Sequence, residues 1–310
     1  MYDILLLGEY FFDIIYSGLT EFPELGREVM SSSLTTTGGG MFITAAALCR
    51  LGARIGWPAT FGSDPYSAFV HDLSLREGID LRLARTLPRP FQRVTTSMPL
   101  RNERAFVTYV DPAPEDDYAF WLSAVSIAEY RHLHVDGARP LAAIGPILET
   151  ARARGKTISM DCQDSPLLKS GCDWKALLQQ VDIFMPNARE ACIIAAVDDV
   201  AEAARIISRW VDRVVVKDGP NGVWIGHSET LVHVEPIFAG EVVDTTGAGD
   251  CFNAGFLYAH IVEKASDRIC GIYGNICGGL SVTSVGGATS SPTYAELRVW
   301  FDKLQTPQLG

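Results

Sequence analysis

Short apolar segments alternate with helical patterns along most of this 310-residue chain, and the alternation limits the folds open to it. Six segments are short and apolar, as buried parallel strands are, at residues 4–8, 54–61, 131–135, 157–161, 182–185 and 213–216. Apolar residues recur at helical spacing between them, at residues 41–51, 66–77, 140–154, 189–196 and 200–210. These units predict an α/β fold, a doubly wound and mainly parallel sheet with helices on both faces.

Two stretches, residues 11–37 and 81–110, break this alternation. They contain segments with a period of two, such as residues 91–98 and 104–110. We therefore expect antiparallel strands that form a small β lobe outside the main sheet. No internal repeat or long linker divides the chain, so residues 1–310 are predicted to form a single domain.

Composition and charge narrow the functional classes. The net charge of −11 argues against nucleic acid as a partner, because that binding depends on a basic surface. No apolar run is long enough to span a membrane, and the chain opens on a strand-like segment without the features of a signal peptide. The seven cysteines include no C-x-x-C pair, so neither a zinc site nor a disulfide framework is expected. We expect a cytoplasmic protein without a membrane partner.

The most informative motif is the run DTTGAGDCFNAGF at residues 244–256. Residues 235–243 are predicted to be extended, and the residues after the glycines are apolar at helical spacing, so the glycines occupy a strand-to-helix turn. The backbone N–H groups of Ala248, Gly249 and Asp250 would lack partners at such a helix start. They could therefore bind an anion such as a phosphate.

Asp250 has two interpretations within this motif. A carboxylate in the first helical turn is favoured by the helix dipole, so Asp250 could be an ordinary helix cap. It is also a poor neighbour for a bound phosphate. Its presence makes sense if it takes a proton from a hydroxyl group that attacks that phosphate.

Other helix starts carry related motifs. Gly38, Gly39 and Gly40 precede a predicted helix, where they could form a hinge, a close backbone approach or a flexible turn. Asn187 and Glu190 follow a short strand, and alone they would be read as a helix cap that closes a capping box. On another predicted strand, His132 and His134 face the same way and could bind a metal, but no third ligand is evident.

The complete run at residues 244–256 resembles, nearly residue for residue, the C-terminal signature of the ribokinase-like (PfkB-type) carbohydrate kinases. Residues 38–52 match the position of the first signature of the same family, and the resemblance covers essentially the whole chain. It implies a ribokinase-like fold in which the segments 11–37 and 81–110 form a β-sheet lid over the sugar. In many members the exposed side of the lid is a dimer interface, so a homodimer through the lid is expected.

The resemblance implies an ATP-dependent phosphotransferase that acts on an alcohol group of a sugar or sugar-like molecule. The implied catalytic group is Asp250 as general base, together with the turn of Gly247, Ala248 and Gly249. Glu190, in the N-x-x-E motif, would act through water on Mg²⁺, an ion that prefers oxygen-rich and water-mediated sites. Asp244 and Thr246 match a monovalent-cation site of ribokinase, which makes K⁺ a further candidate cofactor.

The resemblance also implies binding residues for both substrates. The implied nucleotide site comprises Asn187, Lys217, Gly219, Gly222, Thr245 and Asn275. The implied sugar site comprises Asp13, Gly38, Gly39, Phe11, Ile43, Arg101 and Gln163. Two of these depart from the family pattern, because Ile43 and Phe11 stand where ribokinases have asparagines and cannot make their hydrogen bonds.

Two alternatives stay open. A nucleoside kinase on the same fold is favoured by Phe11 and Phe42, whose rings could stack on a base. A relative that binds a sugar or nucleotide without turnover is the second alternative. The intact turn before Asp250, together with Glu190, argues against that second reading, because a pure binding protein need not keep these residues.

Overall fold

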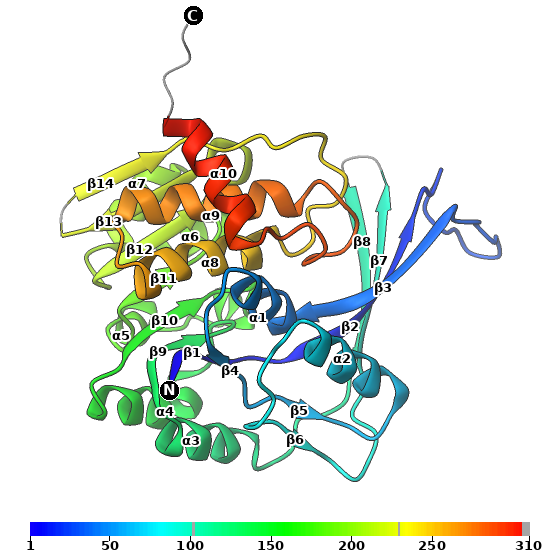
Figure 1. Cartoon of the computed structure of the whole chain (residues 1–310), viewed down its shortest axis with the longest axis horizontal. Coiled ribbons are helices and arrows are strands. Elements are labelled where there is room, and N and C mark those ends of the chain that lie inside the picture. The colour runs from blue at the N-terminus through cyan, green and yellow to red at the C-terminus, as the bar shows by residue number, and fades with distance from the viewer. Residues whose placement is uncertain (101–102, 229, 306–310) are drawn as a thin grey trace, which may run out of the picture.

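A twisted sheet forms the centre of the molecule in the computed structural model, which describes residues 1–100, 103–228 and 230–305 (Figure 1). Within these residues its order, from one edge to the other, is β14 (Thr230–Val234), β13 (Val223–His227), β12 (Arg213–Lys217), β11 (Ile183–Met185), β10 (Thr157–Asp161), β9 (Tyr130–Val135), β1 (Tyr2–Leu7) and β4 (Ile55–Gly56). The strands from β12 to β4 pair in parallel, whereas β13 and β14 add an antiparallel edge. The sheet is therefore mainly parallel, as the sequence predicts.

Both faces of this sheet are buried, because successive strand residues point to opposite sides. In β1, Ile4 and Leu6 belong to one hydrophobic core, and Leu5 and Leu7 belong to the other. The first core lies against α1 (Met41–Arg50), α2 (Pro65–Arg76), α8 (Ala248–Leu257), α9 (Asp267–Ser281) and α10 (Tyr294–Gln305). The second lies against α3 (Asp117–Ile127), α4 (Leu141–Ala153), α5 (Trp174–Leu178), α6 (Ala188–Ala195) and α7 (Val200–Ile207). The doubly wound arrangement is confirmed.

A second, four-stranded sheet projects from one side of the main body (Figure 1). Its order is β3 (Ser33–Gly40), β2 (Tyr10–Ser17), β7 (Arg93–Leu100) and β8 (Glu103–Val110). The pairs β2–β3 and β7–β8 are antiparallel, but β2 and β7 run in parallel. The expectation of purely antiparallel strands is wrong at this pair, because the two hairpins meet side by side and a period of two does not specify strand direction.

Three other expectations from the sequence are corrected. Residues 54–61 do not form one strand: β4 joins the main sheet, while β5 (Thr60–Phe61) pairs with β6 (Arg85–Thr86) in a small separate sheet. Residues 81–92 accordingly lie outside the four-stranded sheet. Residues 235–243, expected to be extended, form an irregular loop between β14 and α8 rather than a strand.

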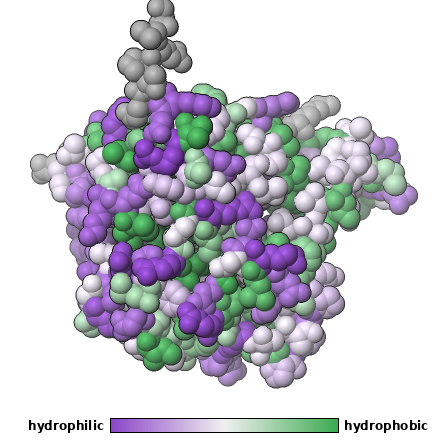
Figure 2. Space-filling view, viewed as in Figure 1, coloured by the Kyte–Doolittle hydropathy of each residue, from purple (hydrophilic) through white to green (hydrophobic). Residues whose placement is uncertain are grey.

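The helix that begins after the glycine turn changes its helical type before it ends. α8 passes into a π-helix (Tyr258–Val262), and residues 284–293 form the turns that lead to α10. Within the described residues no helix is long and apolar enough to cross a membrane. On the face shown in Figure 2, hydrophilic and hydrophobic residues are interspersed.

Candidate active site

The glycine turn at the start of α8 has the geometry of an anion site. Gly247 is the residue before the helix and has φ of +71°, a left-handed conformation that favours glycine. The N–H groups of Gly249 and Asp250 have no acceptor among the described residues, whereas that of Ala248 makes a long bond of 3.4 Å to the carbonyl oxygen of Thr245. Two free N–H groups, rather than the expected three, therefore face outward from the first helical turn.

The two glycines of this turn have different surroundings. A Cβ atom at Gly247 would lie 2.8 Å from both Cα of Gly287 and Cδ1 of Ile43. A Cβ atom at Gly249 would have only the end of the Lys217 side chain near it, with Nζ 3.6 Å away. Gly247 is thus required by packing, while the space beside Gly249 is open toward a lysine ammonium.

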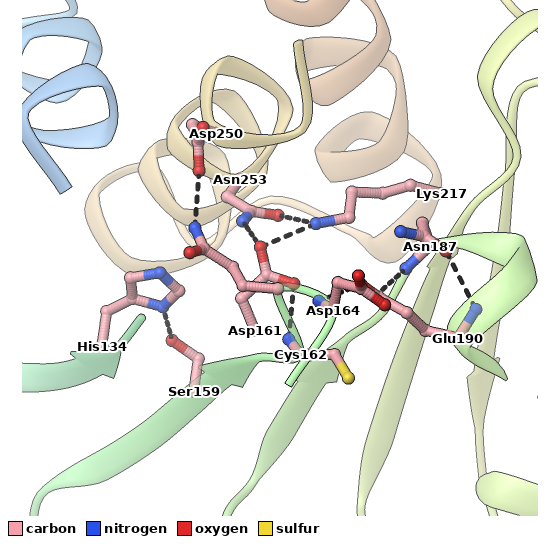
Figure 3. A network of polar contacts seen from close by, with 11 residues as sticks. His134, Ser159, Asp161, Cys162, Asp164, Asn187, Glu190, Lys217, Asp250 and Asn253 are labelled. Carbon is pink, nitrogen blue, oxygen red and sulfur yellow. Dashed lines mark hydrogen bonds and ion pairs between the residues drawn. The ribbon is translucent and has the colours of Figure 1, made fainter. Parts of the chain in front are cut away.

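Asp250 lies in the first turn of α8, with few partners (Figure 3). Its Oδ1 accepts a hydrogen bond of 3.2 Å from Nε2 of Gln163. Burial raises the pKa of Asp250 to about 7, the negative charge of Asp161 adds to the rise, and the Lys217 ammonium opposes it. A carboxyl group with a pKa near 7 can take up a proton and release it at neutral pH.

A buried polar cluster lies below this turn, where β10, β12 and α8 meet (Figure 3). Nζ of Lys217 donates to Oδ2 of Asp161 over 2.9 Å and to Oδ1 of Asn253 over 3.1 Å. Nδ2 of Asn253 donates to the same carboxylate oxygen over 2.6 Å. The resemblance gave Lys217 a role but predicted no contact with either partner, because these contacts depend on three elements far apart in the sequence.

Asn187 and Glu190 form the capping box that their spacing predicts at the start of α6. Oδ1 of Asn187 accepts from the N–H of Glu190, and Oε2 of Glu190 accepts from the N–H of Asn187. Oε1 of Glu190 accepts from the N–H of Asp164 over 2.7 Å, which ties α6 to the loop after β10. Each carboxylate oxygen keeps a further lone pair for a water molecule, so an indirect contact to Mg²⁺ fits the donor set.

A cavity of about 400 Å³ opens beside the glycine turn. Its lining includes five of the six residues expected in the nucleotide site, namely Lys217, Gly219, Gly222, Thr245 and Asn275. Asn187, the sixth, is not part of the lining. Nδ2 of Asn275 donates to the carbonyl oxygens of Val234 and Glu235, so this amide also holds the end of β14.

Several residues that line this cavity are not predicted from the sequence to do so. They are apolar and come from the loop before α8 and from α8 itself: Pro236, Ile237, Phe238, Val242 and Phe252. Phe238 and Val242 are exposed, at 73% and 59% of their surface, although both are large and hydrophobic. Apolar residues in this segment predict a strand, and that prediction does not reveal that they line a pocket.

The expected sugar-binding residues of the small sheet lie together where it joins the main body. Asp13 on β2 is buried, and a Cβ atom at Gly39 of β3 would collide with its carboxylate. Burial raises the pKa of Asp13 to about 7, and the charge of Asp244 adds to the rise. A Cβ atom at Gly38 would collide with the ring of Phe42, so both glycines allow close packing at this junction.

The two residues that depart from the family pattern are also at this junction. Ile43 is buried on α1, and its Cδ1 lies against the turns at Gly247 and Gly287. The ring of Phe11 on β2 lies beside Gly40. Ile43 thus places an apolar side chain directly next to the turn that precedes Asp250. Arg101, the remaining expected substrate contact, lies outside the described residues.

Asp244 and Thr246 are linked within the loop before α8. Oδ1 of Asp244 accepts from the N–H of Thr246 over 2.9 Å, and its Oδ2 accepts from the N–H of Gly286 over 3.0 Å. Asp244 therefore joins the turn before Asp250 to the turn at Gly286 and Gly287. These hydrogen bonds explain the position of Asp244 through loop structure, and the monovalent-cation role stays a prediction.

Asp136, at the end of β9, was not expected in the site. It is buried, and burial together with the charge of Asp250 raises its pKa well above the ordinary value. The two carboxyl groups are therefore close enough to influence each other. The sequence signal was its position directly after a buried strand, at the carboxyl end of the parallel sheet, where ligands of α/β proteins bind.

His132 and His134 do face the same way, but they serve the core. Ser159 lies between them, with its Oγ 2.7 Å from Nε2 of His132 and 2.7 Å from Nδ1 of His134. Both rings are buried. No group of three or more histidine, cysteine, aspartate or glutamate side chains that could hold a metal ion is found in the described part of the chain.

Several known proteins are similar to this chain over most of its length. An uncharacterized sugar kinase of Archaeoglobus fulgidus is 30% identical over 254 residues, which is 79% of this chain and 98% of that protein. An ATP-dependent ribose-1-phosphate kinase of Halopiger xanaduensis is 30% identical over 274 residues, 87% of this chain and 88% of that protein. The crystal structure of ribokinase from Thermotoga maritima has the same fold, with a TM-score of 0.79 at 21% identity, covering 97% of this chain and all of that one.

The model of one family extends over nearly the whole chain. Residues 3–294 match the pfkB family carbohydrate kinase domain, so the match includes both the four-stranded sheet and the turn before Asp250. The chain therefore belongs to the pfkB family of carbohydrate kinases.

Proposed function

We propose that this protein transfers the γ-phosphate of ATP to an alcohol group of a sugar or sugar-like molecule. The observation that carries the proposal is the position of Asp250. Its carboxyl group, with a pKa of about 7, stands in the same helical turn as two free N–H groups and beside a cavity of about 400 Å³. A base next to an anion site is the arrangement that phosphoryl transfer to a hydroxyl group requires.

In this proposal ATP occupies the cavity between Lys217, Gly219 and Asn275, with its adenine ring against the apolar loop residues. Asp250 accepts the proton of the substrate hydroxyl, whose oxygen attacks the γ-phosphorus in line. The free N–H groups of Gly249 and Asp250 stabilise the charge on the transferring group. The four-stranded sheet acts as a lid that excludes water, which would otherwise compete as the nucleophile.

Mg²⁺ would be held near the phosphates through water molecules on Glu190. When bound, it supplies charge that shields the phosphate oxygens. The residues fit such an indirect role, since both carboxylate oxygens of Glu190 are already fixed by backbone N–H groups and keep lone pairs for water. A K⁺ site at Asp244 and Thr246, and a cytoplasmic location, stay predictions.

The acceptor is proposed to present an apolar or planar group toward Phe11 and Ile43. Neither side chain can hydrogen-bond, and Ile43 lies directly against the turn of Gly247. A nucleoside or a deoxygenated sugar would satisfy this condition, so a nucleoside kinase is the second candidate function. The polar part of either acceptor would bind to Asp13, whose carboxylate is buried and accepts no hydrogen bond from the residues that the structure describes.

Dimerisation through the lid is part of the proposal. β8 is the outer strand of the four-stranded sheet, so one of its edges is unpaired. Val107, Tyr109 and Val110 on this strand are exposed at 64%, 56% and 43%. A second copy that covers this strand would bury these side chains and provide partners for the unpaired edge.

The proposal is tested by measuring ATP consumption over a panel of sugars, deoxygenated sugars, sugar phosphates and nucleosides. We expect turnover with at least one neutral acceptor, and its loss in Asp250→Asn. Nucleotide binding without turnover on every acceptor class would contradict the proposal and favour a binding-only protein. Turnover that persists in Asp250→Asn would contradict the role of the base.

A further inference from the structure

Lys217, Asp161 and Asn253 form a closed triad of hydrogen bonds below the catalytic turn (Figure 3). Lys217 ends β12, Asp161 ends β10, and Asn253 lies one turn after Asp250 on α8. The side chains of Lys217 and Asp161 are almost buried, with only 12% and 5% of their surface exposed. The triad therefore fixes the start of α8 to the carboxyl ends of two central strands.

One N–H donor of the Lys217 ammonium has no hydrogen-bond acceptor among the described residues. An ammonium group has three N–H donors, and Asp161 and Asn253 take two of them. Lys217 also lines the cavity of about 400 Å³, and its Nζ would be the first atom met by a Cβ at Gly249, at 3.6 Å. The third donor is therefore within reach of an anion bound at the free N–H groups of Gly249 and Asp250.

Charge balance keeps this lysine in its donor form. Burial lowers the pKa of Lys217, but the charge and hydrogen bond of Asp161, together with the charges of Glu190 and Asp250, outweigh burial, so the pKa lies above its ordinary value. The ammonium is thus protonated at neutral pH. Asp161 also limits the freedom of the flexible side chain, because two hydrogen bonds fix Nζ in one place.

We propose that Asp161 and Asn253 are positioning residues that hold the Lys217 ammonium against the first turn of α8, where its third N–H donates to the transferring phosphoryl group. The inference rests on the proposed kinase function and deepens it. Asp161 and Asn253 act through Lys217, which is the group that touches the substrate.

The reaction in which the lysine takes part is balanced without a further reactant. The substrate oxygen forms a bond to the γ-phosphorus, while the bond between that phosphorus and the β,γ-bridging oxygen breaks and leaves its electron pair on ADP. The hydroxyl proton goes to Asp250. Lys217 exchanges no proton in this step and stabilises the negative charge of the transferring group.

The triad also acts on the base. The charge of Asp161 raises the proton affinity of Asp250, and the charge of Lys217 lowers it. Asp13, whose charge also raises the proton affinity of Asp250, and Asp136, whose own pKa is raised by the charge of Asp250, face the same carboxyl group and are unchanged in every variant of the triad. Removal of Asp161 and removal of Lys217 should therefore move the pKa of Asp250 in opposite directions, which loss of packing alone would not do.

The test compares Lys217→Met, Asp161→Asn and the exchange variant Asp161→Asn/Asn253→Asp, which moves the carboxylate from β10 to α8. Lys175→Met and Asp198→Asn, at exposed positions on other elements, serve as matched controls. For each protein we would measure thermal unfolding, kcat, the affinities for ADP and for a non-hydrolysable ATP analogue, and the pKa of Asp250 by carboxyl NMR in the free protein.

We expect Lys217→Met to weaken binding of the ATP analogue about tenfold more than binding of ADP, the loss typical of one charged hydrogen bond. Asp161→Asn should lower kcat about tenfold or more, and the exchange variant should recover most of this loss. The pKa of Asp250 should fall in Asp161→Asn and rise in Lys217→Met.

Equal loss of affinity for ADP and the analogue would overturn the contact to the transferring group. An exchange variant that folds as the wild type does but is no better than Asp161→Asn would overturn the positioning role, as would pKa shifts of Asp250 in the same direction. If the wild type phosphorylates no acceptor, the proposed function fails, and the binding and NMR measurements still decide the inference.

Discussion

Nε2 of Gln163 donates a hydrogen bond to Oδ1 of Asp250, and this bond links the loop after β10 to the first turn of α8. Gln163 has φ of +51°, an unusual conformation for a residue other than glycine, so the loop is strained into the position that brings the amide to the carboxylate. The Asp250 carboxyl group is therefore held by Gln163 through one oxygen, while its other oxygen has no hydrogen-bond donor among the described residues and, as the proposed base, could meet a substrate hydroxyl.

The rate should depend on the ionisation of Asp250. Its pKa of about 7 predicts that kcat/KM falls about tenfold for each pH unit below that value, because only the carboxylate accepts a proton. Asp250→Asn should lower kcat by about 10²–10⁴, the usual contribution of a positioned general base. A pH profile of kcat/KM that stays flat down to the ordinary pKa of an aspartate would contradict this assignment.

The same substitution should stabilise the free protein at high pH. Because the pKa of Asp250 is raised in the folded state, the folded protein binds a proton more tightly than the unfolded chain, and its stability falls as pH rises toward 7. Asp250→Asn removes this loss, so we expect its free energy of unfolding at pH 8 to exceed the wild type by about 1 kcal/mol or more. Denaturant unfolding at pH 5 and pH 8 measures the difference, which should shrink at the lower pH.

The two glycines before the base should respond differently to alanine. Gly247→Ala forces a Cβ into a left-handed backbone between Gly287 and Ile43 and should destabilise the fold by about 1–2 kcal/mol or more. Gly249→Ala fits the fold and the helix, so its stability should be kept or slightly raised. Its Cβ would stand beside Lys217, where we propose that the phosphate binds, so activity should still be lost. Equal unfolding temperatures for the two variants would contradict the packing argument.

The two roles expected for Glu190, as a helix cap and as a contact to Mg²⁺ through water, can be tested separately. Glu190→Gln keeps one acceptor but turns an NH₂ group toward a backbone N–H, which should cost about 1–3 kcal/mol of stability. If the carboxylate also acts on Mg²⁺, the Mg²⁺ concentration for half-maximal rate should rise. Asp199→Ala, which removes the cap of α7, is the matched control and should lower stability alone. Unchanged metal dependence in Glu190→Gln would leave only the cap.

D-ribose should be a poor acceptor for the wild type. Phe11 and Ile43 cannot replace two asparagines, and each buried hydroxyl left without a partner costs about 1–3 kcal/mol. Ile43→Asn and Phe11→Asn should therefore raise kcat/KM for ribose, by about tenfold for each restored bond. The comparison needs kcat/KM for ribose, fructose, 2-keto-3-deoxygluconate and a nucleoside panel. Efficient phosphorylation of ribose by the wild type would contradict the substrate class that we propose.

Local patterns predicted the elements that depend on local structure. The strand at residues 157–161 and the turn before Asp250 were found because apolar runs and glycines specify them directly. The parallel contact between β2 and β7 depends on how distant segments meet. A period of two indicates a strand but neither its partner nor its direction.

The candidate site divides in the same way. Asp250 and most of the nucleotide site follow from short motifs that carry a family resemblance. The bond between Asp161 and Asn253 joins residues from β10 and α8, and nothing in either segment specifies the other. The sequence does not reveal that Phe238 lines a pocket. An apolar residue in such a loop cannot be told from an apolar residue in a strand by its sequence pattern.

Ile43 of α1 touches the turns at Gly247 and Gly287, which the ribosome makes much later. During translation, the four-stranded sheet and the first helices are complete while the turn that presents Asp250 has not yet been synthesised. Even after Asp250 emerges, its turn lacks one of its two packing partners until Gly287 has followed. We therefore expect nascent chains to remain unable to consume ATP until Gly287 has been translated.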